Sequence, residues 1–231
     1  MTYPRYPRVG EATATQTTVA WDIETCPLPA DHLTDIHHER IEKEILMLRQ
    51  RQPEFAEDEA RRMVKSTHPF VGRICCISAV AGTLEAGHRS PRSFVAAELD
   101  DEPVMLETFW GAVAQFSGRL TWVTFNGKRF DVPYLLARSA HYGIAPTRRD
   151  LVNTYPYKHM PHADLYGVWP CCFTLHDLCQ LLDVETSKNG FGGKQVAQAI
   201  AEGRIDDVVR YCERDVVATW NCYKKLRAFL N

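Results

Sequence analysis

Five side chains with metal-binding or proton-transfer chemistry stand in three separated segments of this 231-residue chain. Asp22 and Glu24 lie two residues apart, Asp131 follows an Asn-Gly pair, and Tyr211 precedes Asp215 by four residues. Two unit charges about 4 Å apart repel by roughly 4 kcal/mol at an effective dielectric of 20, so clustered carboxylates need cations or protons. Because hard oxygen ligands suit Mg²⁺ and Mn²⁺, the residue types predict a site for divalent cations.

The elements around these residues predict how they are presented. Residues 18–25 are β-branched and aromatic and precede Pro27, which predicts a strand with Asp22 and Glu24 on one side. Residues 205–226 carry apolar side chains at helical spacing, which predicts a helix. Residues four apart on a helix share a face, so the phenol and the carboxylate of that segment point the same way. A further helix is predicted to begin at Pro133, just after the central aspartate.

The three segments together resemble a known set of motifs. D-x-E from Asp22, N-x-x-x-F-D-x-P-Y-L from Asn126 and Y-C-x-x-D from Tyr211 resemble the three exonuclease motifs of the DEDD superfamily, in its tyrosine-bearing branch. The motif sequences are most similar to those of predicted 3′-5′ exonucleases related to the proofreading domain of B-family DNA polymerases. The likeness also takes in residues 68–74 and 162–165.

This resemblance implies a fold and a set of roles. The fold would be ribonuclease H-like, an α/β architecture with a mixed β-sheet flanked by helices. The cofactors would be two Mg²⁺ or Mn²⁺ ions, with Asp22 bridging both, Glu24 and Asp215 completing one site, and Asp131 holding the other through water. Tyr211 has a reference pKa of about 10 and is neutral at pH 7, so it is predicted to orient the attacking water.

Substrate contacts are predicted around the first two motifs. Thr25 would offer its backbone to the 3′ end, Asn126 would hydrogen-bond a sugar or phosphate, and Lys128 would bind a phosphate. Phe130 would stack on a base, although packing in the core explains this ring equally well. Asp164 is expected to cap or support the site and not to bind metal directly.

Together with the predicted cation site, the resemblance implies a metal-dependent 3′-5′ exonuclease that acts on single-stranded DNA or frayed 3′ ends. The remaining residues leave no room for a polymerase palm or fingers, so proofreading would need a polymerase or repair partner in trans. One alternative is a non-cutting nucleic-acid-binding module of the same fold, although such a module has no need of four clustered carboxylates. Another is an RNA-trimming 3′-5′ exoribonuclease, because nothing in the sequence shows how a 2′-OH would be received.

Composition sets the frame for this function. The 231 residues are 45% hydrophobic with a net charge of -2, which suits one domain with a sizeable core. No apolar run approaches the roughly 20 residues of a membrane span, so no membrane association is expected. The eight cysteines contain no C-x-x-C spacing, which favours reduced thiols in the core and a cytoplasmic location.

The chain is predicted to have a flexible N-terminal tail at 1–16 and a single exonuclease domain at 17–231. A charged helical insertion at about 30–67 would either grip substrate or pack on the sheet. Residues 148–167 are predicted to be irregular because prolines and glycine interrupt them. The other predicted elements are strands at 70–80, 93–97 and 120–125 and helices at 103–116, 133–142, 174–182 and 194–201.

Overall fold

The computed structural model describes residues 16–155, 158–169, 171–186 and 190–230. Within those residues, six strands form one mixed sheet in the order β3-β2-β1-β5-β6, with β4 also paired to β2. β1 runs antiparallel to β2 and parallel to β5, which is parallel to β6. The predicted α/β class with a mixed sheet is therefore confirmed. The strands are β1 Thr17–Pro27, β2 Gly72–Thr83, β3 Gly87–His88, β4 Arg92–Val95, β5 Leu120–Thr124 and β6 His162–Asp164.

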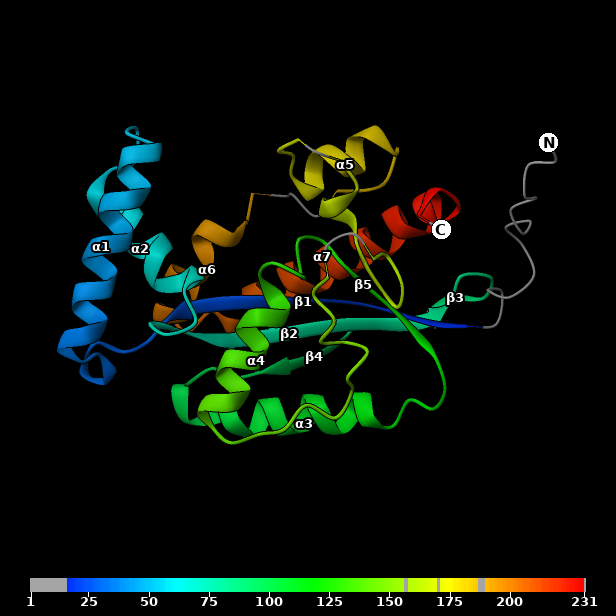
Figure 1. Ribbon diagram of the computed structural model, residues 1–231, viewed down its shortest axis with the longest axis horizontal. Coiled ribbons are helices and arrows are strands. Elements are labelled where there is room, and N and C mark those ends of the chain that lie inside the picture. The colour runs from blue at the N-terminus through cyan, green and yellow to red at the C-terminus, as the bar shows by residue number, and fades with distance from the viewer. Residues whose placement is uncertain (1–15, 156–157, 170, 187–189, 231) are drawn as a thin grey trace, which may run out of the picture.

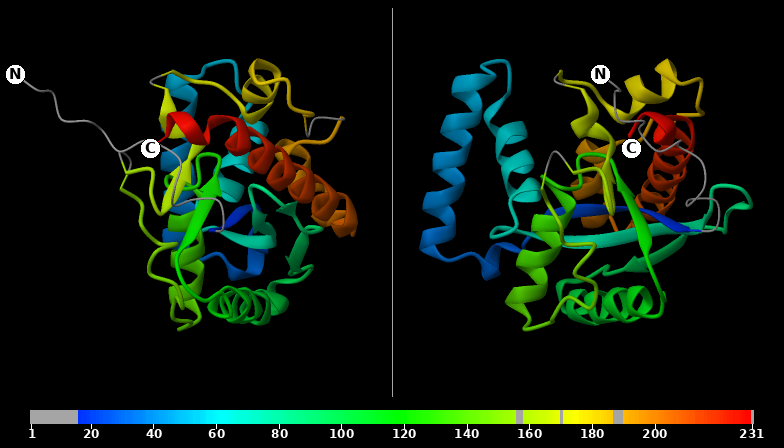
Figure 2. Two further views of the ribbon diagram at one scale, coloured as in Figure 1. Left: turned by 90° about the vertical axis from the view of Figure 1, so that its right-hand side faces the viewer. Right: turned by 45° about the vertical axis from the view of Figure 1, so that its right-hand side comes forward.

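Helices cover both faces of the sheet (Figure 1). α3 (Glu102–Ala114) and α4 (Asp131–His141) pack on one face, where their apolar side chains join those of β1 and β2 in the largest core cluster. α7 (Ile205–Leu226) crosses the other face with α5 (Leu175–Leu181) and α6 (Gly193–Ala201). The two views of Figure 2 show α3 and α7 on opposite sides of the sheet.

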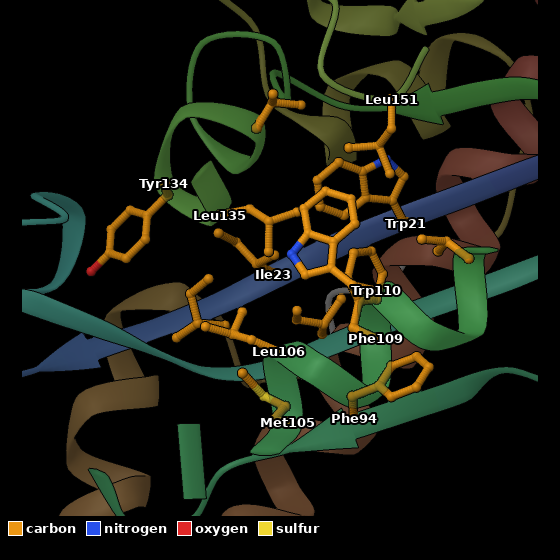
Figure 3. Close-up of a cluster of buried hydrophobic side chains, with 14 of the residues drawn as sticks. Trp21, Ile23, Phe94, Met105, Leu106, Phe109, Trp110, Tyr134, Leu135 and Leu151 are labelled. Carbon is orange, nitrogen blue, oxygen red and sulfur yellow. The ribbon is translucent and has the colours of Figure 1, made fainter. Parts of the chain in front are cut away.

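Successive side chains of β1 point alternately toward these two helical layers. Trp21 and Ile23 point toward α3 and α4, where they pack with Trp110 and Leu135 (Figure 3). Residues at even positions point the other way, and Ala20 packs in a separate cluster beneath α7. Because side chains alternate along a strand, Asp22 and Glu24 also face α7.

A pair of helices, α1 (Asp35–Arg51) and α2 (Glu57–Thr67), leaves the sheet between β1 and β2. Figure 1 shows them side by side at the left of the molecule, and we refer to residues 35–67 as the α1–α2 arm. Ile41 and Ile45 of α1 pack against Val64 of α2, and a bidentate contact joins Arg61 to Glu42 at 2.5 and 3.3 Å. The arm is thus a unit with its own small core.

One buried ion pair joins α3 to α4, and a hydrogen bond from β2 ties it to the sheet. Glu102 Oε2 lies 2.6 Å from Arg138 Nη2, and these side chains are 0% and 4% exposed. Glu102 also accepts hydrogen bonds from the Ile74 backbone N–H at 2.8 Å and the Tyr142 hydroxyl at 2.9 Å. The carboxylate is therefore fully partnered without water.

Several expectations need correction. The stretch 148–167 is not irregular throughout, because it contains β6, which is only three residues long. α4 begins at Asp131 and not at Pro133, so the aspartate lies in the first helical turn. The predicted tail at 1–16 falls, up to residue 15, outside the described residues. Short 3-10 helices, which had no predicted counterpart, occur at Ala30–His32, Leu99–Asp101, Leu165–Val168 and Arg227–Phe229.

Two further features bear on the expectations from composition. All eight cysteines are free thiols, and only Cys171 and Cys172 are exposed. None of the helices in the described ranges combines the length and apolar character needed to cross a bilayer.

Candidate active site

Helix α7 brings its motif against the acidic side of β1. Cys212 Sγ donates to the Asp22 backbone oxygen at 3.6 Å and to Asp22 Oδ2 at 3.7 Å. Carboxylate oxygens of Asp22 and Glu24 and the Cys212 sulfur all lie within 4.8 Å of one another. Two segments 190 residues apart therefore meet at the candidate metal centre.

Asp131 joins the same cluster because β5 is shorter than β1. The pairing between these strands ends at Ala20 and Val123, and β1 continues alone on that side. Farther along β1, the Ile23 N–H donates to Asp131 Oδ1 at 3.1 Å. The carboxylate thus occupies the position that a neighbouring strand would otherwise fill, and the hydrogen bond fixes it beside the acidic face of β1.

The four carboxylates interact strongly in the metal-free protein. Burial raises the pKa of Asp22 well above its usual value, and the charges of Asp131, Glu24 and Asp215 raise it further. Burial and the charge of Asp215 likewise raise the pKa of Glu24. The pKa of Asp131 rises to about 7, chiefly because the group is buried. Such a set of oxygen donors fits hard divalent cations, which would compensate the shared negative charge.

Tyr211 lies in the same cluster and stays neutral. Burial raises the pKa of its phenol, and the negative charges of Asp215, Glu24 and Asp22 raise it further. A hydrogen bond with Asp215 also favours the protonated phenol. The ring packs against Phe191 with centroids 5.5 Å apart. At neutral pH the hydroxyl is therefore a hydrogen-bond donor and not a base.

The loop before α4 is held in a single shape by Asp164. Its carboxylate accepts the backbone N–H groups of Asn126 at 2.7 Å, Lys128 at 3.0 Å and Tyr166 at 3.1 Å. Asn126 has φ of 65°, a left-handed conformation that asparagine tolerates better than most residues. A Cβ on Gly127 would lie 2.5 Å from the Thr124 side chain, so only glycine fits there. The expected supporting role of Asp164 is confirmed.

Two of the predicted substrate contacts share one cavity with the acidic cluster. Thr25 and Phe130 line a cavity of about 320 Å³ together with Glu24. The Phe130 ring also packs on Tyr134 with centroids 5.5 Å apart, so it belongs to both the cavity wall and the core.

Lys128 is placed differently from the prediction. Its residue is only 4% exposed, and its ammonium donates to the carbonyls of Tyr155 at 2.8 Å and Lys158 at 2.5 Å. Because those two carbonyls bind the ammonium, Lys128 anchors the loop after α4 and does not point toward a phosphate site. For Asn126, the described contacts involve the backbone and not the side-chain amide.

Sequence reasoning missed two contributors to the site. Cys212 was expected to be a small core hydrophobe, yet its thiol also orients Asp22. Helical spacing gave a usable signal, because residues 212 and 215 lie three apart on one face. The second contributor is α2, whose Arg62 and Met63 line the cavity beside Glu24. No pattern within the arm indicates which core element it faces.

The stability of the metal-free protein should depend on pH partly through Asp131, and Asp131→Asn removes this group's contribution together with its effect on the pKa of Asp22. The pKa of Asp131 is about 7 in the folded protein, against an ordinary value of 3.8. Between these two pH values the folded protein therefore keeps a proton that the unfolded protein has lost. Stability from this group is fully present below about pH 4 and is lost as pH rises through 7. In thermal melts with EDTA, we expect the melting temperature of the variant to exceed that of wild type by a margin that grows toward pH 7.

His162 has the opposite dependence, so wild type must be compared with the variant at each pH. Burial lowers the pKa of His162 to about 3, and stability from this group therefore increases as pH rises toward 6.5. Both proteins contain His162, and its contribution cancels in the difference. A margin that shrinks with rising pH would contradict the assignment.

Solved structures share this fold at low identity. The family B DNA polymerase of Pyrobaculum calidifontis matches with a TM-score of 0.60 and 18% identity over 92% of this chain and 24% of that one. A structure of E. coli exonuclease I in complex with a dT13 oligonucleotide gives a TM-score of 0.46 and 14% identity over 92% and 41%. The chain thus spans less than half of either protein. At 18% identity the likeness to the polymerase shows the fold alone, an α/β fold of the ribonuclease H-like type.

Comparison of the sequence itself is more specific. A search of curated proteins gave no significant match. Residues 67–230, well over half of the chain, match a family model described as a predicted 3′-5′ exonuclease related to the exonuclease domain of PolB. The matched residues contain two of the three acidic motifs, those at the start of α4 and on α7, whereas Asp22 and Glu24 of β1 precede them. The chain therefore belongs to the family of predicted 3′-5′ exonucleases related to the exonuclease domain of PolB.

Proposed function

We propose that this protein is a 3′-5′ exonuclease that uses two Mg²⁺ or Mn²⁺ ions to hydrolyse phosphodiester bonds at the 3′ end of single-stranded or frayed DNA. One observation carries the proposal: the carboxylates of Asp22, Glu24, Asp131 and Asp215, from three distant segments, act on one another in one largely buried cluster. Burying like charges together is costly unless cations compensate them. The family relation to the exonuclease domain of PolB supports DNA as the substrate.

The residues of the cluster divide the work. The four carboxylates would hold the cations, with Asp131 fixed by the Ile23 N–H and Asp22 oriented by Cys212. Bound divalent cations would lower the pKa of a water and offset the charge that develops on the scissile phosphate. The neutral phenol of Tyr211, which hydrogen-bonds Asp215 in this structure, would turn to orient the attacking water when cations occupy the Asp215 carboxylate.

A 5′-labelled oligonucleotide tests this function directly. Purified protein with Mg²⁺ or Mn²⁺ is expected to shorten single-stranded DNA from its 3′ end in single-nucleotide steps, and EDTA is expected to stop the reaction. An RNA strand of the same sequence and a blunt duplex are run in parallel. Shifted but intact bands would instead identify a non-cutting binder, and faster trimming of RNA would identify an exoribonuclease.

Replacing Tyr211 with Phe removes the hydroxyl and keeps the ring. We expect cutting to slow by roughly 10- to 100-fold, since a hydrogen bond to a charged partner contributes about 1.5–3 kcal/mol. Mn²⁺ affinity, measured by calorimetry, should not change, because the phenol is protonated and is not a ligand. A parallel loss of Mn²⁺ binding would show that the phenol contributes to the metal site.

A further inference from the structure

The cavity beside Glu24 is closed on one side by the α1–α2 arm. Its volume is about 320 Å³, at the small end of the range of ligand pockets. β1 and Phe130 form one wall, and the start of α6 forms another. The family match begins at residue 67, so nearly all of the third wall lies outside the matched part of the chain. That wall consists of Glu59, Arg62, Met63, Ser66 and Thr67 of α2.

The charges on this wall leave one arginine available. Glu59 is neutralised by Lys194 of α6, whose Nζ lies 2.7 Å from Glu59 Oε1 and 5.3 Å from the centre of the Phe55 ring. Arg62 is exposed and has no ion pair with any residue in the described ranges. The cavity therefore has a carboxylate, Glu24, at its catalytic end and an unpaired guanidinium on the wall formed by the arm.

α2 is anchored to the core as a fixed wall. Tyr134, which is 1% exposed, donates its hydroxyl hydrogen bond to the Ser66 carbonyl at 3.1 Å. A Cβ on Gly72 would lie 2.6 Å from the Lys65 carbonyl, so the end of α2 and the start of β2 are in direct contact. These contacts fix the backbone of α2, from which the exposed Arg62 side chain extends, relative to the sheet.

We propose that α2 forms the second wall of the pocket for an unpaired 3′-terminal nucleotide and that Arg62 binds a phosphate of the strand leading into it. This inference rests on the proposed function and adds a phosphate-binding residue that lies outside the three acidic motifs. The apolar side chains of Met63 and Phe130 offer surfaces for a base, and guanidinium groups bind phosphate bidentately. Because the cavity is only about 320 Å³, we expect it to exclude a base that is still paired to its complement.

Arg61 provides a matched control on the same helix. Arg62→Ala and Arg61→Ala each remove one positive charge, but Arg61 faces α1, where it pairs with Glu42 and Glu57. Binding of a 5′-fluorescein oligothymidylate is measured by anisotropy in EDTA, so that no cutting occurs. We expect Arg62→Ala to weaken binding about 10-fold and to reduce the salt slope by roughly 0.7, the value for one phosphate contact on a single strand. Arg61→Ala should stay within about twofold of wild type, and Arg62→Lys should recover part of the affinity.

Kinetics separates this inference from the proposed function. In the presence of Mn²⁺, Arg62→Ala should raise KM for single-stranded DNA about 10-fold and leave kcat nearly unchanged. If wild type cuts DNA but the two alanine variants behave alike, the role of Arg62 is wrong and the exonuclease assignment stands. If wild type cuts nothing yet binds the oligonucleotide through Arg62, the function is wrong and the binding wall stands. Wild-type protein that binds no oligonucleotide would overturn the inference.

Discussion

Replacing Asp22 with Asn is expected to reduce the rate of DNA cutting by about 10³-fold or more. The substitution keeps the size of the side chain but removes a negative charge from the centre of the cluster, where Asp131, Glu24 and Asp215 all act on it. Losing a metal ligand removes several kcal/mol of transition-state stabilisation, and each 1.36 kcal/mol is tenfold in rate. Release of labelled nucleotide under saturating Mn²⁺ measures the effect.

The same variant is expected to fold at least as well as wild type when metal is absent. Burial and like charges raise the pKa of Asp22, so the charged form is disfavoured in the folded protein and its removal relieves repulsion. Asp206→Asn, which makes the same chemical change at an exposed position in the first turn of α7, should leave activity unchanged and lower the melting temperature only slightly, because it removes a charge that stabilises the helix N-terminus. Wild-type cutting rates in Asp22→Asn would refute the assignment of the metal site.

Replacing Arg138 with Ala should destabilise the protein by about 3–5 kcal/mol, because it leaves the Glu102 charge buried without its partner. Glu102 is completely buried and lies 2.6 Å from the guanidinium. Urea unfolding followed by circular dichroism measures the loss. The carboxylate would retain hydrogen bonds from Ile74 and Tyr142, but these donors are neutral and do not compensate its charge.

An exposed ion pair provides the contrast for this experiment. Arg40 lies 2.8 Å from Glu44 on α1, and these side chains are 45% and 25% exposed. The free energy of unfolding of Arg40→Ala should be close to that of wild type, because solvent screens such pairs. The double variant Arg138→Met with Glu102→Leu removes both buried charges and is expected to recover most of the lost stability. An Arg138→Ala protein as stable as Arg40→Ala would show that the buried pair contributes little.

Local sequence patterns predicted the parts of the fold that depend on local periodicity. Alternation along β1 placed Asp22 and Glu24 on one side of a strand, and the apolar spacing of 205–226 gave the exact extent of α7. The order of the three acidic motifs then supplied the ribonuclease H-like fold through family resemblance. That these segments converge is a property of the tertiary structure, which no single segment encodes.

Other features escaped prediction for physical reasons. β6 has three residues, which is too short for any periodicity, and it forms only because β5 offers it an edge. The partner of Arg138 lies 36 residues away, and neither residue carries a local signal of burial. Lys128 was expected to face a phosphate, but the loop after α4 supplies two carbonyls that the sequence does not mark as acceptors. Each miss involves a contact between segments that are distant in the chain.

Helix α4 connects the nuclease centre to the arm over less than one turn. Asp131 is its first residue, and Tyr134, three residues later, donates to the Ser66 carbonyl at the end of α2. At 1.5 Å of rise per residue, the two Cα atoms are separated by only about 4.5 Å along the helix axis. The end of α2 is therefore linked to the Asp131 carboxylate through one short helical segment and one hydrogen bond. A displacement of the arm that keeps this hydrogen bond would act on the first turn of α4, where Asp131 lies.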